Sequence, residues 1–174
     1  MSAESTGVAV PATMDRRMLQ TYLSDHLTGA AGGRARALKM SEWYADREIG
    51  PALAEIAREL DEEHGHLREL IDALDLRRGL PLQALARVGE LLGRAKTNGR
   101  VLTGSPMTPL LELELLRAAV NGKQGLWQVL AEYADELGLD AAEYVRRTAD
   151  ADRQQETLER LHAEVRPEAL RPPD

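Results

Sequence analysis

Apolar residues recur with a helical period along four long stretches of the chain. The spacing alternates between three and four residues, which is typical of helices that pack in a bundle. It is clearest over 51–76, where the repeated positions are Leu53, Ile56, Leu60, Glu63, Leu67, Leu70 and Leu74. The same spacing continues through 15–46, 109–137 and 141–166. No segment shows the period of two that strands require, so the pattern predicts an all-α protein.

Proline and capping residues mark where three of the predicted helices begin. Pro51 follows a glycine and Pro109 follows Thr108. Proline is favoured in the first turn of a helix, because it lacks the N–H that would be unpaired there. Thr108 is expected to be the N-cap of its helix. Asp140, with Glu143 three residues later, is typical of a capping box and predicts the start of the fourth helix.

The connections between these helices predict their arrangement. The links within the first pair and within the second pair are short, so each pair forms an antiparallel hairpin. Residues 77–108 make a long crossover between the pairs, with an additional short amphipathic helix inside it. We therefore predict an up-down-down-up four-helix bundle over 15–166. We expect a disordered leader over 1–14 before it and a mobile tail over 167–174 after it.

Composition narrows the classes of function. Asp and Glu (29) outnumber Lys and Arg (22), which gives a net charge of −7. This charge argues against nucleic acid or an anionic membrane surface as a partner. There are no cysteines, so disulfides, thiol chemistry and thiolate metal sites are excluded. The sequence shows neither a signal peptide nor a membrane span, and we expect a cytoplasmic protein.

One position in the apolar stripe over 51–76 is a carboxylate, Glu63. An ionised carboxylate is rarely buried without a partner, so a cation, a metal or several hydrogen-bond donors must lie close to it. Counting along the helices from Pro51 and Pro109 places Lys123 near the same height, where it can supply the cation. We therefore predict a buried polar layer made of Glu63, His66, Asn121, Lys123, Asp152 and Gln155.

The residues around Glu63 resemble a known metal-binding motif. Glu63 and His66 form a Glu-x-x-His pair, and Leu70 follows four residues after the histidine, as in the second helix of ferritins and bacterioferritins. Residues three apart share one face of a helix, so both side chains can reach the same metal. The chain is thus similar to the ferritin-like superfamily over about 15–165. This resemblance implies a ferritin-like bundle with a metal site.

The sequence departs from the family pattern at the other ligand positions. The first helix has small residues over 29–33 where a carboxylate belongs, and the third helix has Asn121 close to Lys123. On the fourth helix, the pair Glu159 and His162 lies a turn or two beyond the expected height. We therefore interpret the metal site as degenerate.

Two functions are compatible with this polar layer. In the first, Lys123 holds Glu63, no cofactor is bound, and the protein is a non-catalytic structural or interaction protein that forms a homodimer. In the second, it is a metal-binding oxidoreductase or metal-storage protein with iron or manganese. The ligands would then come from Glu63, His66, Asp152, Asp25, His26, Glu159 and His162. We prefer the first, because the charge of Lys123 would repel a metal cation.

The first predicted helix contains a run of small residues. Its core positions include Ala30, Gly33 and Ala37, and a glycine inside a helix costs about 1 kcal/mol relative to alanine. Such a run needs a packing reason. It predicts either a close approach of this helix to a neighbour or room for a bulky group.

Overall fold

The structure is a computed structural model that describes residues 7–76 and 105–171. Its helices are α1 (Arg16–Trp43), α2 (Gly50–Ala73), α4 (Met107–Glu132), α5 (Ala134–Leu137) and α6 (Ala141–Ala169). The described residues contain no strand, which confirms the prediction of an all-α protein. Within these two ranges, no helix combines the length and the apolar character needed to cross a membrane.

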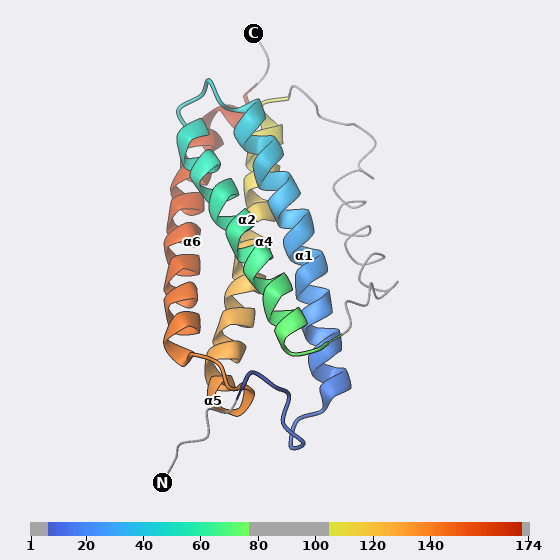
Figure 1. Cartoon of the computed structure of the whole chain (residues 1–174). Coiled ribbons are helices and arrows are strands. Elements are labelled where there is room, and N and C mark those ends of the chain that lie inside the picture. The colour runs from blue at the N-terminus through green and yellow to red at the C-terminus, as the bar shows by residue number, and fades with distance from the viewer. Residues whose placement is uncertain (1–6, 77–104, 172–174) are drawn as a thin grey trace.

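The four long helices lie side by side (Figure 1). α1 is antiparallel to α2, because Arg16 at its start lies 3.3 Å from the carboxylate of Asp75, just beyond the end of α2. α4 is antiparallel to α6, because His162 late in α6 lies 3.2 Å from Glu114 early in α4. α2 and α4 run in the same direction (Figure 1). These directions are the ones that the connection lengths predict.

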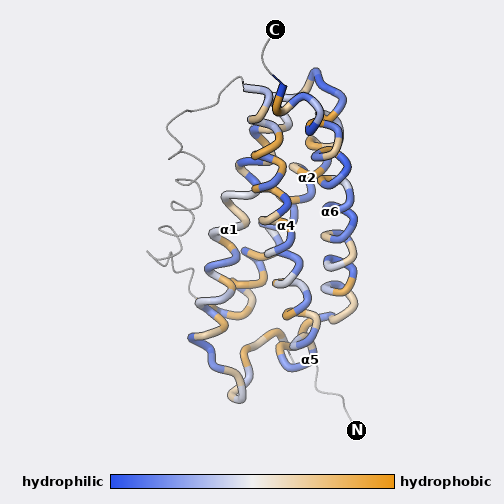
Figure 2. The backbone as a smooth tube through the Cα atoms, turned by 180° about the vertical axis from the view of Figure 1, so that it is seen from behind, coloured by the Kyte–Doolittle hydropathy of each residue, from blue (hydrophilic) through white to orange (hydrophobic). Residues whose placement is uncertain are grey.

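One apolar core runs along the inside of the helices. Figure 2 shows hydrophobic and hydrophilic segments alternating turn by turn along each long helix. Every repeated position of the stripe over 51–76 is buried, as the spacing predicts. Each fully buried leucine or isoleucine contributes about 1.5–3 kcal/mol through removal of its apolar surface from water. This stripe therefore attaches α2 to the rest of the bundle.

One of the two predicted N-caps is confirmed and the other is not. Asp140 caps α6, because its carboxylate accepts a hydrogen bond at 2.9 Å from a backbone N–H two residues later. Gly138 ends α5 with a φ of 67°, which glycine adopts at little cost. Thr108 is not the cap of α4. The helix already begins at Met107, whose N–H donates to the hydroxyl of Ser105 at 3.3 Å.

Part of the predicted disordered leader is ordered. The backbone N–H of Ala9 donates to the carbonyl of Leu137 at 3.2 Å, and Val10 and Met14 pack against the core. Burial of these apolar side chains fixes the segment over 7–14 although it continues no helical pattern. The rest of the predicted leader lies outside the described residues.

The last long helix, α6, extends beyond its predicted end. It continues through Pro167 to Ala169, so the beginning of the predicted tail over 167–174 is helical. Proline removes one hydrogen bond from a helix, but Ala169 is buried and Val165 packs against the core. These contacts hold the last turn in place. The short helix predicted inside the crossover lies outside the described residues.

Candidate functional site

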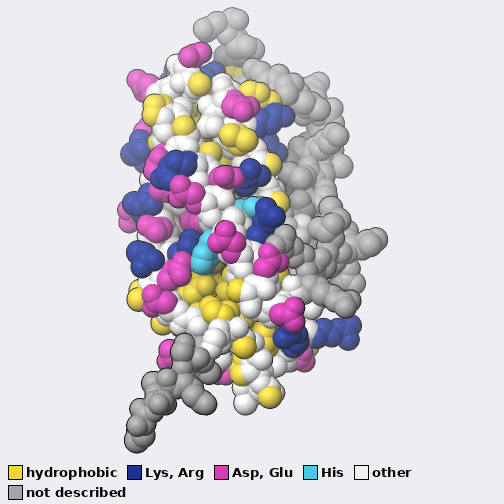
Figure 3. Space-filling model, viewed as in Figure 1, with side chains coloured by type: hydrophobic (Ala, Val, Ile, Leu, Met, Phe, Trp, Pro, Cys, Tyr) yellow, Lys and Arg dark blue, Asp and Glu magenta, His cyan; other side chains and the backbone are white. Residues whose placement is uncertain are grey.

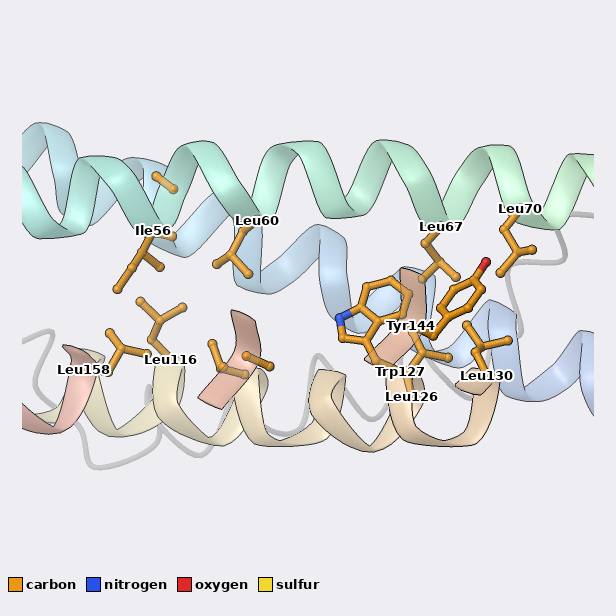
Figure 4. Packing of buried hydrophobic residues seen from close by; sticks show 14 of the residues in the cluster. Ile56, Leu60, Leu67, Leu70, Leu116, Leu126, Trp127, Leu130, Tyr144 and Leu158 are labelled. Atoms are coloured by element: carbon orange, nitrogen blue, oxygen red, sulfur yellow. The ribbon is translucent and has the colours of Figure 1, made fainter. Parts of the chain in front are cut away.

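The apolar core is interrupted near the middle of the bundle. Figure 4 shows two groups of buried side chains, one with Ile56, Leu60, Leu116 and Leu158 and the other with Leu67, Leu70, Leu126, Trp127, Leu130 and Tyr144. Glu63 of α2 lies between Leu60 and Leu67 in the sequence and is only 8% exposed. A carboxylate therefore occupies the level between the two apolar groups.

Lys123 of α4 is the cation beside Glu63, as the sequence predicts. Its Nζ lies 2.5 Å from Oε2 of Glu63. The two side chains are 10% and 9% exposed, respectively. Because both charges are almost out of water, each depends on the other for compensation of its lost hydration.

Gln154 of α6 completes the polar contacts of this pair. Its side-chain oxygen accepts a hydrogen bond from Lys123, and its Nε2 donates to Oε1 of Glu63 at 3.2 Å and to Oε2 of Glu59 at 2.7 Å. We call these four residues the Glu63 network. Both oxygens of Glu63 accept a hydrogen bond, and three helices of the bundle contribute to the network.

Burial lowers the pKa of Lys123, because the ammonium loses hydration that its neutral form does not need. The negative charge of Glu63 and the hydrogen bond to it act in the opposite direction. An ammonium at this position without Glu63 would therefore lose its proton more readily.

Four residues of the predicted polar layer lie outside the Glu63 network, namely Asn121, Asp152, Gln155 and His66. Asn121 is exposed on α4, and Asp152 is exposed on α6, where it accepts a hydrogen bond from Gln124. Gln155 donates to a backbone carbonyl of α4 at 3.1 Å. The last long helix, α6, is rotated relative to the predicted register, so that Gln154 faces the core in place of Gln155.

His66 lies among aromatic side chains and not, as predicted, beside Glu63. Its ring centroid is 6.1 Å from that of Trp127 and 5.8 Å from that of Tyr144. Its Nδ1 is 3.5 Å from Oε1 of Glu143, the residue expected to complete the capping box of α6. Nε2 of His66 is buried and has no hydrogen-bond partner among the described residues. The imidazole is thus turned toward α6.

The other residues of the alternative metal site are scattered. His26 of α1 packs against Tyr22, with 4.6 Å between ring centroids. His162 lies 3.2 Å from Glu114, and Glu159 is exposed on α6. Within the part of the chain that the structure describes, no three His, Asp or Glu side chains are grouped so that they could hold a metal ion.

A second buried carboxylate, Glu112 of α4, is not part of the predicted polar layer. Its Oε1 lies 2.6 Å from Arg36, and its Oε2 accepts a hydrogen bond at 2.9 Å from the hydroxyl of Tyr44. Burial raises the pKa of Tyr44, and the hydrogen bond to Glu112 raises it further. The signal in the sequence was position: Glu112 precedes Leu116 by four residues, so the two share a helix face, and Leu116 is buried.

A cavity of about 440 Å³ opens beside the Glu63 network. Asp25 and His26 of α1 and Lys123 of α4 line it, together with Glu63 and Leu60 of α2. Burial lowers the pKa of His26, while the nearby charge of Asp25 raises it. The cavity thus has apolar and polar lining at one level of the bundle.

Small residues form the walls of this cavity on α1 and α4. A Cβ atom on Gly33 would lie 3.5 Å from the Cβ of Ala119, which is an ordinary contact. A Cβ on Gly29 or on Gly122 would have no neighbour within 4 Å. A side chain as small as alanine would therefore fit at Gly33, so packing there does not need the predicted close approach of the first helix. The predicted room for a bulky group is found at Gly29, which is exposed.

Comparisons of the chain with protein-family models, with curated proteins and with solved structures found no match. The two structural features that a function must explain are therefore the charged pair in the core and the cavity next to it. The pair is held by Gln154, and the cavity shares Glu63 and Lys123 with it.

Proposed function

We propose that the protein is a non-catalytic helical bundle of the ferritin-like type, in which the Glu63 network occupies the place of a metal centre. In this proposal the protein acts as a structural or interaction protein. The direction of the four long helices supports the fold assignment, together with the Glu-x-x-His spacing of Glu63 and His66. The contact between Lys123 and Glu63 supports the loss of the metal.

The chemistry of the donor set at Glu63 does not fit a metal ion. A protonated lysine 2.5 Å from the carboxylate would repel a second cation. Both carboxylate oxygens already accept hydrogen bonds, from Lys123 and from Gln154. The imidazole of His66, which the motif would supply, is directed toward Glu143 instead.

A metal-free network of this kind can still serve a purpose in the fold. Burying a charged pair contributes little net stability, but a misaligned helix would strand one of its charges. Glu63, Lys123 and Gln154 come from three helices and have to meet at one height. We propose that they fix the relative height of α2, α4 and α6.

Metal analysis of the purified protein tests this proposal. We expect no stoichiometric iron or manganese after incubation with either ion, and the same melting temperature with and without a chelator. About one or more ions per chain, lost on Glu63→Leu and retained on Glu156→Leu at an exposed position of α6, would overturn it. That result would support the alternative of an iron- or manganese-dependent oxidoreductase or storage protein.

We propose a second copy of the same chain as the partner. The face formed by α2 and α6 carries positive and negative side chains in alternation (Figure 3). Many of them are paired, as Arg58 is with Glu55 at 2.6 Å and with Glu62 at 2.5 Å.

The surface that suits the contact lies at the bundle end where α1 and α6 finish and α4 begins. Trp43 there is 49% exposed and lines a cavity of about 360 Å³ with Pro109. An exposed apolar side chain beside a hollow suits a symmetric contact between two copies.

Light scattering across a range of protein concentrations tests the homodimer. We expect a dimer for the parent chain and a shift toward monomer for Trp43→Ser. Tyr133→Ser is the matched control, because Tyr133 is also exposed but lies between α4 and α5, and α5 is at the opposite end of the bundle (Figure 1). A parent chain that stays monomeric at every concentration would contradict the homodimer.

A further inference from the structure

We propose that the cavity beside the Glu63 network binds a compact, uncharged, largely apolar organic molecule that carries one hydrogen-bond-accepting oxygen, such as an aryl ketone. This inference goes beyond the proposed function, which concerns the network and the outer surface. It is carried by the volume of the cavity, by the open space at two of its glycines and by an unpaired buried donor.

The volume of the cavity fits a molecule of this kind. Pockets for small ligands generally measure about 300–1,000 Å³, and this cavity measures about 440 Å³. An apolar cavity of roughly 150 Å³ is known to accept a benzene molecule. The space here is therefore sufficient for a ligand with two fused aromatic rings and a short substituent.

Two wall positions leave space that the protein does not fill. Gly29 of α1 and Gly122 of α4 both line the cavity, and a Cβ on either would meet no atom within 4 Å. Protein packing therefore does not require glycine there, although alanine would favour the helices. Both glycines are exposed, so the open space beside them is continuous with solvent, and a ligand entering between the two helices would contact both positions.

The indole N–H of Trp127 is a buried donor without a partner among the described residues. Trp127 lines the cavity and is only 1% exposed. Figure 4 shows its nitrogen directed away from Tyr144, toward the part of the core between Leu60 and Leu67, which also line the cavity. A buried N–H without an acceptor is costly, and an oxygen of the ligand would satisfy it.

The charged pair of the Glu63 network favours an uncharged ligand on its side of the cavity. Glu63 and Lys123 compensate each other, so an ion inside the cavity would find no free charge of opposite sign in this pair. Burial of an uncompensated charge is strongly unfavourable. Lys123 uses two of its three N–H groups within the network.

Fluorescence titration with prodan tests the proposal on the full chain. Prodan is an uncharged naphthyl ketone whose emission shifts to the blue in apolar surroundings. In a Trp43→Phe background Trp127 is the remaining tryptophan, so energy transfer from it reports binding next to the cavity. We expect saturable binding of one probe per chain, and competition by acetylnaphthalene. Ethylnaphthalene lacks the oxygen and should compete roughly three- to tenfold less well, the effect of one hydrogen bond.

Matched glycine variants locate the binding. Gly122→Leu fills the cavity, and we expect it to weaken prodan binding by about tenfold or more. Gly125→Leu is the control, because a Cβ there also meets no atom within 4 Å, yet Gly125 does not line the cavity. Both changes favour the helix, so the fold should persist. Trp127→Phe should abolish the preference for acetylnaphthalene over ethylnaphthalene.

Several results would overturn the proposal. The first is a parent chain without saturable binding of prodan. The second is binding that Gly122→Leu and Gly125→Leu affect equally, because the probe would then sit elsewhere. The third is conversion of a dimer to a monomer by Gly122→Leu in a chain that binds no probe, since the cavity would then be a protein interface. Metal content is measured separately, so none of these results bears on the Glu63 network.

Discussion

The Nζ atom of Lys123 lies 2.5 Å from the carboxylate of Glu63, on two parallel helices whose connection is the longest in the bundle. Short links fix the height of α1 against α2 and of α4 against α6. No short link fixes α2 against α4. The buried pair does so, because sliding either helix by one turn would separate the two charges in a medium that solvates neither.

Removal of the cation should therefore be costly. We expect Lys123→Met to lower the free energy of unfolding by about 3–5 kcal/mol, because it leaves the carboxylate of Glu63 buried without its partner. Urea unfolding followed by circular dichroism measures the effect. Lys39→Met is the matched control: Lys39 is exposed, and we expect a change within about 0.5 kcal/mol.

The double variant Lys123→Met with Glu63→Leu separates this explanation from a general loss of packing. It should recover most of the stability that Lys123→Met removes, since no charge is then stranded. Additive losses would contradict the assignment of the cost to the buried charge.

The hydrogen bond between Tyr44 and Glu112 should contribute stability at one end of the bundle. We expect Tyr44→Phe to lower the free energy of unfolding by about 1.5–3 kcal/mol, the range for a hydrogen bond to a charged group. The hydroxyl is 2.9 Å from the carboxylate. Tyr133→Phe, at an exposed position, should change little. Equal effects of the two substitutions in urea unfolding would count against a strong bond at Glu112.

Two landmarks explain why the pair of Glu63 and Lys123 could be predicted. Pro51 and Pro109 both mark first turns of helices, and these helices start at the same end of the bundle. Heights counted from the two prolines are therefore directly comparable. The stripe over 51–76 was equally clear, because it contains a leucine or isoleucine at every repeated position except Glu63.

The register of α6 could not be fixed by spacing alone. Gln154 and Gln155 both satisfy an alternation of three and four between Ala151 and Leu158. The deciding signal is Leu161, which lies seven residues after Gln154 and is more apolar than His162. Leu161 is fully buried, as is Gln154.

The spacing of Glu112 to Leu116 did not decide whether Glu112 is buried, and the run of small residues did not decide whether a cavity forms. An acidic residue near the start of a helix is favoured by the helix dipole and is commonly solvated. Only the distant Arg36 and Tyr44 show that Glu112 is buried. Small residues over 29–33 are compatible with a close helix contact and with a gap between helices. Which of the two forms depends on the position of α4.

Stability should fall on mild acidification because of His66. Burial lowers the pKa of His66 below its ordinary value of 6.5, Arg147 lowers it further, and Glu143 and Glu69 oppose the shift. Below about pH 6.5 the unfolded chain therefore binds more protons than the folded chain. We expect the free energy of unfolding to decrease from there as the pH falls through the folded pKa, by at most about 1.4 kcal/mol per pH unit for one proton.

Replacement of this imidazole tests the assignment. His66→Gln removes the group that titrates and should reduce the dependence of stability on pH, measured by urea unfolding at several pH values between 5 and 7. His26 and His64 also have lowered pKa values through burial, so part of the slope should remain. An unchanged slope would show that His66 does not contribute.

Two glycines of α2 should respond oppositely to the same substitution. A Cβ on Gly50 would lie 2.8 Å from the carbonyl oxygen of Ala45 and closer still to that of Tyr44. Both are backbone atoms, so the turn between α1 and α2 would have to move, and we expect Gly50→Ala to cost about 1–3 kcal/mol. A Cβ on Gly65 would meet no atom within 4 Å. Gly65→Ala should therefore stabilise by about 0.4–1 kcal/mol, because alanine restricts the unfolded chain and favours the helix. Urea unfolding of both variants measures the difference, and a stabilising Gly50→Ala would show that the tight turn before α2 is not formed as described.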